Sequence, residues 1–469
     1  MNQFVRRSAL ALTVIAALLS PTAAKAIPPF ARKYHTSCAT CHTAFPNLNT
    51  FGEAFKRHGY RFPGRKDEDM TKEETVPLGA DSYKKVYPKA IWPDQISAGA
   101  PLGMVLESFA NYNNRPGSAK GISLDDVGHG SDILAGGTFD DTYSFFGELG
   151  IDSDAVSLER AAVTIANVFG GDSGVYMRIG RFVPDFFEFN NKTRMVGADA
   201  GTMLIGTTVG VGDNGFVLQD PGMRGFELSG FLGSDTGVNA GWVQAEASSP
   251  TGQVASPGNR KDFYFHIDHK FIGDGEQAYR LDGTQAQAST SGKEGAATSG
   301  GLEDTPWGDT QSLTAGAFYF NGGTVLANPA DPTFATVPVR LFDDFRIYGG
   351  DLAFIDHQWK LNAAVSKQDH DQPDIAAPLV SREAFTWMIE ANYAWHPCLF
   401  TALRYENFNQ DEHAGDPNPT TDVRRFVPSL TYLARANMKF TLQALIEDRP
   451  AEANGYKFNN AILGVVLGF

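Results

Sequence analysis

The chain has 469 residues, a formal net charge of −15, 42% hydrophobic and 20% charged residues, and only three cysteines. This composition differs from that of disordered chains and of small disulfide scaffolds. The acidic balance argues against a nucleic-acid-binding protein, which needs a basic patch. Beyond the first 26 residues there is no run of 18 apolar residues, so no transmembrane helix is expected in the mature chain.

Residues 1–26 have the order of parts that is typical of a secretory signal peptide. Arg6 and Arg7 form the positive start, a short apolar stretch follows from Ala9 to Leu19, and an A-x-A cleavage site ends at Ala26. We therefore expect the mature chain to be exported and to begin with residue 27. Export by a twin-arginine route is the weaker alternative.

The next feature is Cys38-Ala39-Thr40-Cys41-His42, which has the C-x-x-C-H pattern of c-type haem attachment. Two thiols at this spacing bond to the two vinyl groups of one haem, and the adjacent histidine becomes the proximal ligand of the iron. The alternative is a disulfide or a thioredoxin-type motif, but that motif would lie between a strand and a helix of an α/β domain. The sequence therefore predicts one covalent haem c on Cys38, Cys41 and His42.

A short helix is expected directly after this motif. Residues at i+3 and i+4 spacings place four side chains on one face: Leu48, Phe51, Phe55 and His58. Asn47 or Asn49 can cap its start, and Gly59 suits a left-handed end. Phe51 and Phe55 either lie against the haem or pack into a neighbouring domain. Residues 27–75 would thus form a small helical mono-haem cytochrome c segment, which is too small to fold comfortably alone.

The second axial position of the iron has two equal candidates. His58 lies on the aromatic face of the expected helix, and Met104 follows a Pro-Leu-Gly turn at the start of the next domain. His35 and Met70 are further possibilities. The choice matters because a methionine ligand raises the reduction potential relative to a histidine ligand.

Residues 76–99 are polar and rich in proline and are expected to be a linker, whereas residues 100–469 have the alternating pattern of long β-strands. Residues 383–395 show it most clearly, because Phe385, Trp387 and Ile389 alternate with Thr386, Met388 and Glu390. Sixteen segments qualify as strands: 101–113, 143–151, 157–167, 174–183, 201–209, 224–232, 237–246, 260–271, 312–321, 344–355, 358–367, 382–395, 398–409, 422–433, 437–448 and 459–469.

A soluble β-sandwich would also alternate, but several details favour a membrane barrel. The strands are long enough to cross a bilayer on a tilt, aromatic residues gather at their ends, and short turns alternate with long polar loops. The chain also ends in Phe469, similar to the assembly signal of bacterial outer-membrane proteins. The expected fold is all-β, an outer-membrane antiparallel β-barrel of about 16 strands. An even number places both barrel ends on the periplasmic side.

Three stretches of the N-terminal segment carry a resemblance to a known family. Residues 27–32 read Ile-Pro-Pro-Phe-Ala-Arg, residues 38–42 are the C-x-x-C-H motif, and residues 51–60 read F-G-x-x-F-K-x-x-G-Y. Over residues 28–60 the chain resembles the fused monohaem cytochrome–porins of the outer membrane, whose best-known members are ferrous-iron oxidases. Beyond residue 60 the resemblance is one of architecture only.

The resemblance implies that Cys38 and Cys41 hold the haem and that His42 ligates its iron. It also implies that electrons pass from extracellular Fe(II), or another metal, to a periplasmic c-type cytochrome or a similar carrier. The chain would then be a ferrous-iron:cytochrome c oxidoreductase in contact with outer-membrane lipid, with no nucleic acid as partner. Two alternatives remain open: an outward electron conduit to external metals, and a diffusion porin whose haem segment is a plug or redox sensor.

Overall fold

The computed structural model describes most of the chain after the expected cleavage point. The described residues are 29–45, 47–63, 65–72, 75–77, 95–97, 101–114, 120–124, 130–139, 141–152, 155–171, 173–185, 223–233, 235–244, 246–247, 254–255, 262–273, 307, 311–326, 341–371, 381–410, 422–448 and 457–468. The signal peptide, the expected strand at 201–209 and Phe469 lie outside them. Among the described residues, no helix combines the length and the apolar character needed to cross a membrane.

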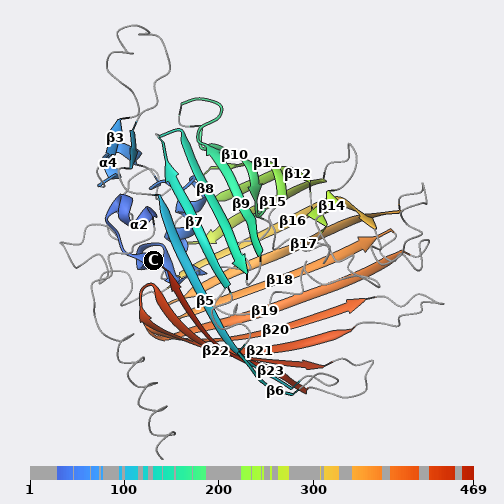
Figure 1. Cartoon of the computed structure of the whole chain (residues 1–469). Helices are drawn as coiled ribbons and strands as arrows, with labels where there is room; N and C mark the ends of the chain where they lie inside the picture. The colour runs from blue at the N-terminus through green and yellow to red at the C-terminus, as the bar shows by residue number, and fades with distance from the viewer. Residues whose placement is uncertain are drawn as a thin grey trace, which may run out of the picture.

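Most of the described residues form one closed antiparallel barrel (Figure 1). Its strands are β5 (Leu102–Asn113), β6 (Gly121–Ser123), β7 (Gly130–Thr138), β8 (Tyr143–Asp152), β9 (Ala155–Ile165), β10 (Val175–Phe182), β11 (Met223–Leu232), β12 (Thr236–Gln244), β15 (Asp262–Ile272), β16 (Gln311–Leu326), β17 (Leu341–Asp356), β18 (Trp359–His370), β19 (Arg382–His396), β20 (Leu399–Gln410), β21 (Val423–Arg435), β22 (Met438–Asp448) and β23 (Lys457–Gly468). The barrel closes where β23 pairs with β5. Because β6 and β7 pair with opposite ends of β5, they share one position, and the described strands occupy sixteen positions.

The predicted strand count is confirmed, but by a partly different set of strands. Every predicted segment other than 201–209 corresponds to an observed strand, and the sixteenth position is taken by β7, which sequence analysis missed. β7 contains Gly130, Gly136 and Gly137, which weaken the alternation of apolar and polar residues. Gly136 has a packing role, because a Cβ atom there would lie 2.9 Å from the ring of Phe30.

The predicted 76–99 linker also differs from expectation, because its ends pair. β3 (Thr75–Pro77) forms an antiparallel ladder with β4 (Gln95–Ser97). A second small ladder joins β13 (Glu246–Ala247) to β14 (Val254–Ala255). Both ladders lie outside the barrel sheet.

The barrel is apolar on the outside and polar on the inside. On β19, Phe385 and Ile389 are 47% and 49% exposed, whereas Thr386 and Glu390 are fully buried. A soluble sandwich buries its apolar face, so this inverted pattern is that of a barrel with a lipid-facing exterior. The predicted barrel, rather than the sandwich, is therefore confirmed.

The two rims of the barrel differ. Tight turns are more frequent at one rim, where they join β17 to β18, β19 to β20, and β21 to β22, whereas β8 and β9 are joined closely at the opposite rim. The barrel sheet begins and ends at this same rim, where Gly468 pairs with Val105 and Leu102 pairs with Ala135. We call it the short-turn rim.

Residues 29–72 form a compact segment in the short-turn rim, which we call the plug. Its elements are α2 (Pro29–Tyr34), η1 (Cys38–Thr40), β1 (His42–Ala44), β2 (Asn47–Leu48), α3 (Thr50–Arg57) and α4 (Asp67–Met70). The plug contacts distant parts of the wall, because Phe30 packs against β7 and His58 stacks on Phe231 of β11. Ala44 also belongs to the same buried apolar cluster as Phe400 of β20. The small N-terminal segment is thus supported by the barrel around it.

Helix α3 has both of the predicted end signals. The Asn49 side chain accepts a hydrogen bond from the Gly52 N–H at 2.8 Å, so the cap is Asn49 and not Asn47. At the other end Gly59 has a φ of +66°, the N–H of Gly59 donates to Lys56 O, and the N–H of Tyr60 donates to Phe55 O. This pair of bonds is a Schellman motif, which requires a left-handed residue at position 59.

Candidate functional site

A cavity of about 380 Å³ lies between the plug and the inner wall of the barrel. The plug contributes residues of α2, η1 and α3, and the wall contributes residues of β5, β7, β8, β9, β22 and β23. Cys38, Cys41 and His42 all line this one cavity. The structure therefore brings the three residues of the C-x-x-C-H motif to a common space.

Aromatic rings form much of the wall of this cavity. Phe30, Tyr60 and Phe146 make a continuous stack, with ring centroids 5.2 and 5.3 Å apart. Phe55 also lines the cavity, whereas Phe51 packs beside Phe55 in the apolar core of the plug. The two candidate phenylalanines thus have different roles, one at the cavity and one behind it.

The C-x-x-C-H loop is held against the start of α3. The Asn49 side chain donates to Thr40 O at 3.1 Å, and its backbone N–H donates to Cys41 O at 3.0 Å. A Cβ atom on Gly52 would lie 2.0 Å from Cys41 O, so only glycine permits this approach. Local packing therefore sets the position of the motif before any ligand is bound.

The thiols are in an environment that favours the protonated form. Burial raises the pKa of Cys41 to about 12 and also raises the pKa of Cys38. Catalytic thiols of disulfide oxidoreductases need a lowered pKa, because the thiolate is the reactive species. The surroundings therefore argue against the thioredoxin-type alternative.

The residues of the cavity fit a covalently attached haem c. The volume falls within the ~300–1,000 Å³ of typical ligand and cofactor sites. Cys38 and Cys41 would supply the thioether sulfurs, His42 would supply the proximal nitrogen, and the rings would cover the flat macrocycle. This is the chemistry that the sequence motif predicts.

Neither candidate for the second axial ligand lines the cavity. His58 follows α3, and its ring stacks on Phe231 at 5.6 Å and meets Tyr176 edge-on at 5.4 Å. Val105 and Glu107 face the cavity, so Met104 between them lies on the other face of β5. Alternation of side chains within the predicted strand 101–113 is the signal that could have shown this from the sequence.

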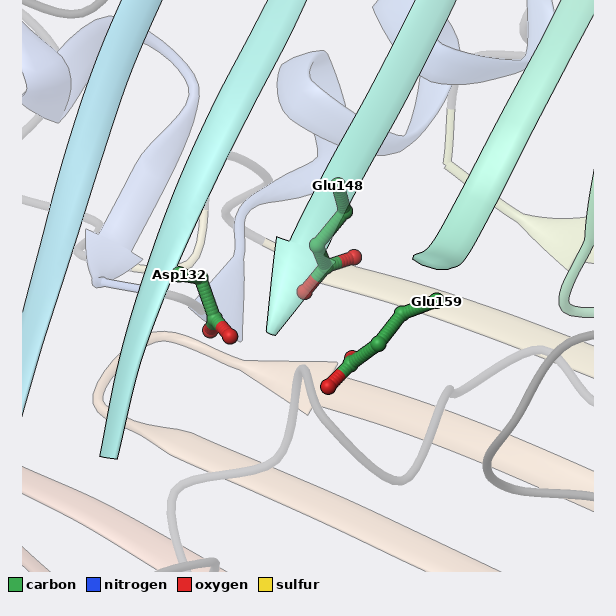
Figure 2. A group of neighbouring side chains, drawn as sticks. All are labelled: Asp132, Glu148 and Glu159. Atoms are coloured by element: carbon green, nitrogen blue, oxygen red, sulfur yellow. The ribbon is translucent and has the colours of Figure 1, made fainter. Parts of the chain in front are cut away.

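Three carboxylates gather on the wall strands β7, β8 and β9. Asp132, Glu148 and Glu159 point toward one another, with oxygen atoms within 4.8 Å of each other (Figure 2). Glu159 is the extra residue of a β-bulge, because Glu148 pairs with Arg160 and Leu149 pairs with Leu158. Carboxylate oxygens are ligands for hard cations, although Arg160 Nε already lies 2.8 Å from Glu148 Oε2. Because the bulge changes which side chains of β9 share a face, simple alternation along the strand would not place Glu159 beside Glu148.

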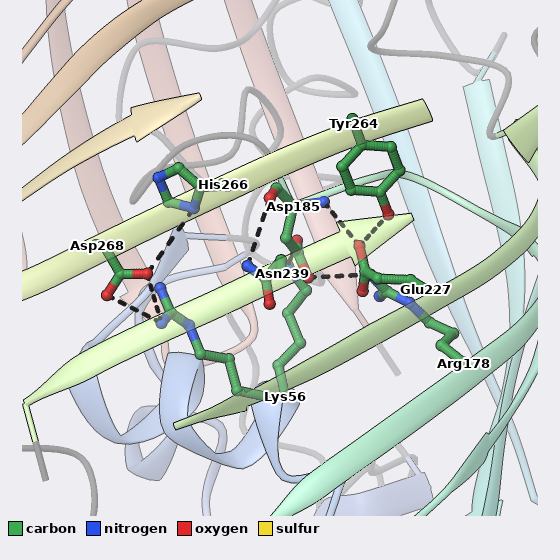
Figure 3. A network of polar contacts seen from close by, with 9 residues as sticks. Lys56, Arg178, Asp185, Glu227, Asn239, Tyr264, His266 and Asp268 are labelled. Atoms are coloured by element: carbon green, nitrogen blue, oxygen red, sulfur yellow. Dashed lines mark hydrogen bonds and ion pairs between the residues drawn. The ribbon is translucent and has the colours of Figure 1, made fainter. Parts of the chain in front are cut away.

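Lys56 of α3 connects the plug to a network of charges on the barrel (Figure 3). Lys56 Nζ lies 2.6 Å from Asp185 Oδ1, Arg178 Nη2 lies 3.0 Å from Asp185 Oδ2, and Arg178 also pairs with Glu227. Tyr264 donates a hydrogen bond to Glu227. Burial alone would lower the pKa of Lys56 and raise that of Asp185. The opposite charges outweigh burial, so the pKa of Lys56 is raised and that of Asp185 is lowered.

Arg57 makes a second connection from α3 to the wall. Arg57 Nη1 lies 3.2 Å from Asp268 Oδ1 on β15. On the same strand His266 lies beside Asp268 (Figure 3). The Nε2 atom of His266 is 3.2 Å from Asp351 Oδ1 on β17. Consecutive residues of α3 thus hold the plug to two places on the barrel, the segment just after β10 and strand β15.

Comparisons with known proteins bear on the fold. No family model matches the chain, and no curated protein matches it. Among solved structures, OmpF of Salmonella typhi is similar with a TM-score of 0.50 and 11% identity, over 78% of this chain and 97% of that one. OmpT of Vibrio cholerae has a TM-score of 0.47 and 9% identity, over 78% and 98% of the two chains. An anion-selective porin from Comamonas acidovorans has a TM-score of 0.43 and 10% identity, over 78% and 97%. The likeness to OmpF shows that the chain has the porin fold, an antiparallel β-barrel of the outer-membrane type.

Proposed function

We propose that this protein transfers electrons at the bacterial outer membrane through one haem c, covalently attached to the plug in the barrel mouth. One observation carries the proposal: Cys38, Cys41 and His42 line a single aromatic cavity between the plug and the wall. A diffusion porin needs no such cavity, and a soluble cytochrome needs no barrel.

The residues of the plug would bind and shield the cofactor. A bound haem c supplies reversible one-electron chemistry at its iron. Cys38 and Cys41 fix its position, His42 holds the proximal side, and the Phe30–Tyr60–Phe146 stack excludes water from one side of the cavity. Met104 and His58 stay as candidate second ligands that would require a rearrangement, because neither lines the cavity.

The proposed direction is inward, from extracellular Fe(II) to a periplasmic c-type cytochrome or a similar carrier. The resemblance of residues 28–60 to the cytochrome–porins supports this direction and the activity of a ferrous-iron:cytochrome c oxidoreductase. The short-turn rim would face the periplasm, as short turns do in outer-membrane barrels, so both barrel ends would lie there. The exposed apolar belt, with Phe385 and Ile389, would contact lipid.

The test uses the full chain, purified anaerobically in detergent and oxidised. Fe(II) is added near neutral pH, and haem absorbance is followed by stopped flow. We expect rapid reduction of one haem per chain. Changing Cys38 and Cys41 to alanine should abolish the covalent haem spectrum. Cys398→Ala should leave it unchanged, because Cys398 lies in the turn between β19 and β20 and does not line the cavity.

Other outcomes would redirect the proposal. A haem that dithionite reduces but Fe(II) does not would exclude the iron-oxidase activity and favour an outward conduit. High ion conductance of the haem-loaded protein in planar bilayers would favour a diffusion porin with a haem-bearing plug. Wild-type protein without a haem spectrum would contradict the proposed attachment of haem to Cys38 and Cys41, and with it the whole proposal.

A further inference from the structure

The cavity wall carries a lysine, Lys439, that forms no direct ion pair with a carboxylate among the described residues, although Glu107 acts on its charge from a greater distance. Among the described residues, three cationic side chains line the cavity: Lys56, Arg160 and Lys439. Lys56 is paired with Asp185 and Arg160 with Glu148, at 2.6 and 2.8 Å. Within the described part of the chain, no carboxylate oxygen lies within 4.0 Å of Lys439 Nζ. Lys439 is therefore the cation of this cavity that is available to a ligand.

Strand register fixes where Lys439 lies. It is the second residue of β22 at the short-turn rim, and it pairs with Leu433 on one side and Val466 on the other. Val466 also lines the cavity and pairs in turn with Glu107 of β5. Because neighbouring strands lie ~4.8 Å apart, the backbones at Lys439 and Glu107 are separated by about 10 Å. Lys439 is half-buried and thus partly withdrawn from water, and Glu107 attracts its charge without pairing with it directly.

A half-buried ammonium group of this kind favours an anionic partner. The other charged side chains that line the cavity come from α3 and from strands β5, β7, β8 and β9. They are Lys56, Glu107, Asp132, Glu148 and Arg160. The carboxylates among them would repel an anion, and the two cations already have carboxylate partners. The anionic end of a ligand would therefore turn toward β22.

A haem carries two propionate carboxylates, and its attachment through Cys38 and Cys41 leaves these groups free. We propose that Lys439 binds a haem propionate, so that the barrel wall as well as the plug holds the cofactor. This inference rests on the proposed function for the presence of haem. The bond would be a charge-assisted hydrogen bond, which is stronger than a neutral one. It would make Lys439 a positioning residue that also sets the potential of the iron.

The test compares full-length Lys439→Gln, Lys439→Met and Lys439→Arg with wild type. Haem per chain is measured by the pyridine haemochrome method, the midpoint potential by spectroelectrochemical titration, and the propionate bending band by resonance Raman spectroscopy. Lys360→Gln is the matched control, because Lys360 on β18 is also half-buried but does not line the cavity.

We expect one haem per chain in every variant, because the thioether bonds do not involve Lys439. Lys439→Gln and Lys439→Met should lower the midpoint potential, since losing a cation favours the more positive ferric state, and should shift the propionate band. Lys439→Arg should restore both, and Lys360→Gln should change neither.

Haem-loaded Lys439→Gln and Lys439→Met with wild-type potential and propionate band would overturn the assignment. An equal fall in potential in Lys360→Gln would also overturn it, because the effect would then be that of general charge. Wild-type protein without haem would instead refute the proposed function, and it would be seen before any variant is compared.

Discussion

At the scale of single residues, the candidate site depends on very close contacts around the C-x-x-C-H loop. Gly52→Ala is expected to displace Cys41, because the new Cβ would meet Cys41 O at 2.0 Å. Overpacking of this kind typically costs ~1–3 kcal/mol. We expect faster proteolysis of the plug and a several-fold lower fraction of chains with covalent haem, measured by absorbance per chain.

Gly130→Ala is the matched control for this substitution. Its new Cβ would lie 3.6 Å from Glu107 Cβ, an ordinary contact, so haem content should stay at the wild-type level. Equal loss of haem in both variants would show that the contact at Gly52 has no special role.

At the scale of elements, α3 is held in the barrel by ion pairs. Lys56→Met removes one partner of the Lys56–Asp185 pair and leaves the half-buried Asp185 with Arg178 as its remaining ion-pair partner. Breaking a fully buried pair costs ~3–5 kcal/mol, and this half-buried pair is expected to lie at the lower end, about 3 kcal/mol. Chymotrypsin should therefore cleave the plug on the order of 100-fold faster, because a factor of ten corresponds to ~1.4 kcal/mol.

An exposed ion pair provides the comparison for Lys56→Met. Lys367 on β18 pairs with Glu383 on β19, and both side chains are more than a third exposed. Such pairs contribute ~0–1 kcal/mol, so Lys367→Gln should leave the cleavage rate nearly unchanged. Similar rates for Lys56→Met and Lys367→Gln would mean that α3 is not held by its charges.

The same contact predicts how plug docking depends on pH. The pKa of Asp185 is lowered in the folded chain, mainly by Lys56 and Arg178 acting against burial. Its stabilising contribution is therefore complete above the ordinary Asp value of ~3.9 and is lost as the pH falls toward the lowered value. Hydrogen exchange of plug peptides should differ between wild type and Asp185→Asn at neutral pH, and the difference should shrink below pH ~3.9. A difference that grows in acid would contradict this sign.

At the scale of the whole molecule, we expect the plug to decide whether the barrel conducts. Empty barrels of 16 strands have an aqueous channel, but here α2 and α3 lie in the short-turn rim. We expect wild-type protein to conduct poorly in planar bilayers. A Lys56→Met, Arg57→Met double variant should open more often, because the ion pairs that join α3 to Asp185 and Asp268 are lost. Equal conductance of the two proteins would show that the ion pairs of α3 do not limit ion flow through the barrel.

Local chemistry is the part of this protein that the sequence alone determined. The spacing of Cys38, Cys41 and His42 predicts covalent haem attachment, and the caps at Asn49 and Gly59 are set by backbone geometry within one helix. The barrel was predictable for a similar reason, because alternation with period two depends only on neighbouring residues along a strand.

The tertiary structure decided everything that depends on register and on distant contacts. It placed glycine-rich β7 in the barrel beside Phe30, turned Met104 away from the cavity, and packed His58 against the wall. It also brought Lys439 to the cavity from nearly 400 residues beyond His42. No short-range pattern carries this information, because a shift of one residue in register moves every side chain of a strand to the opposite face.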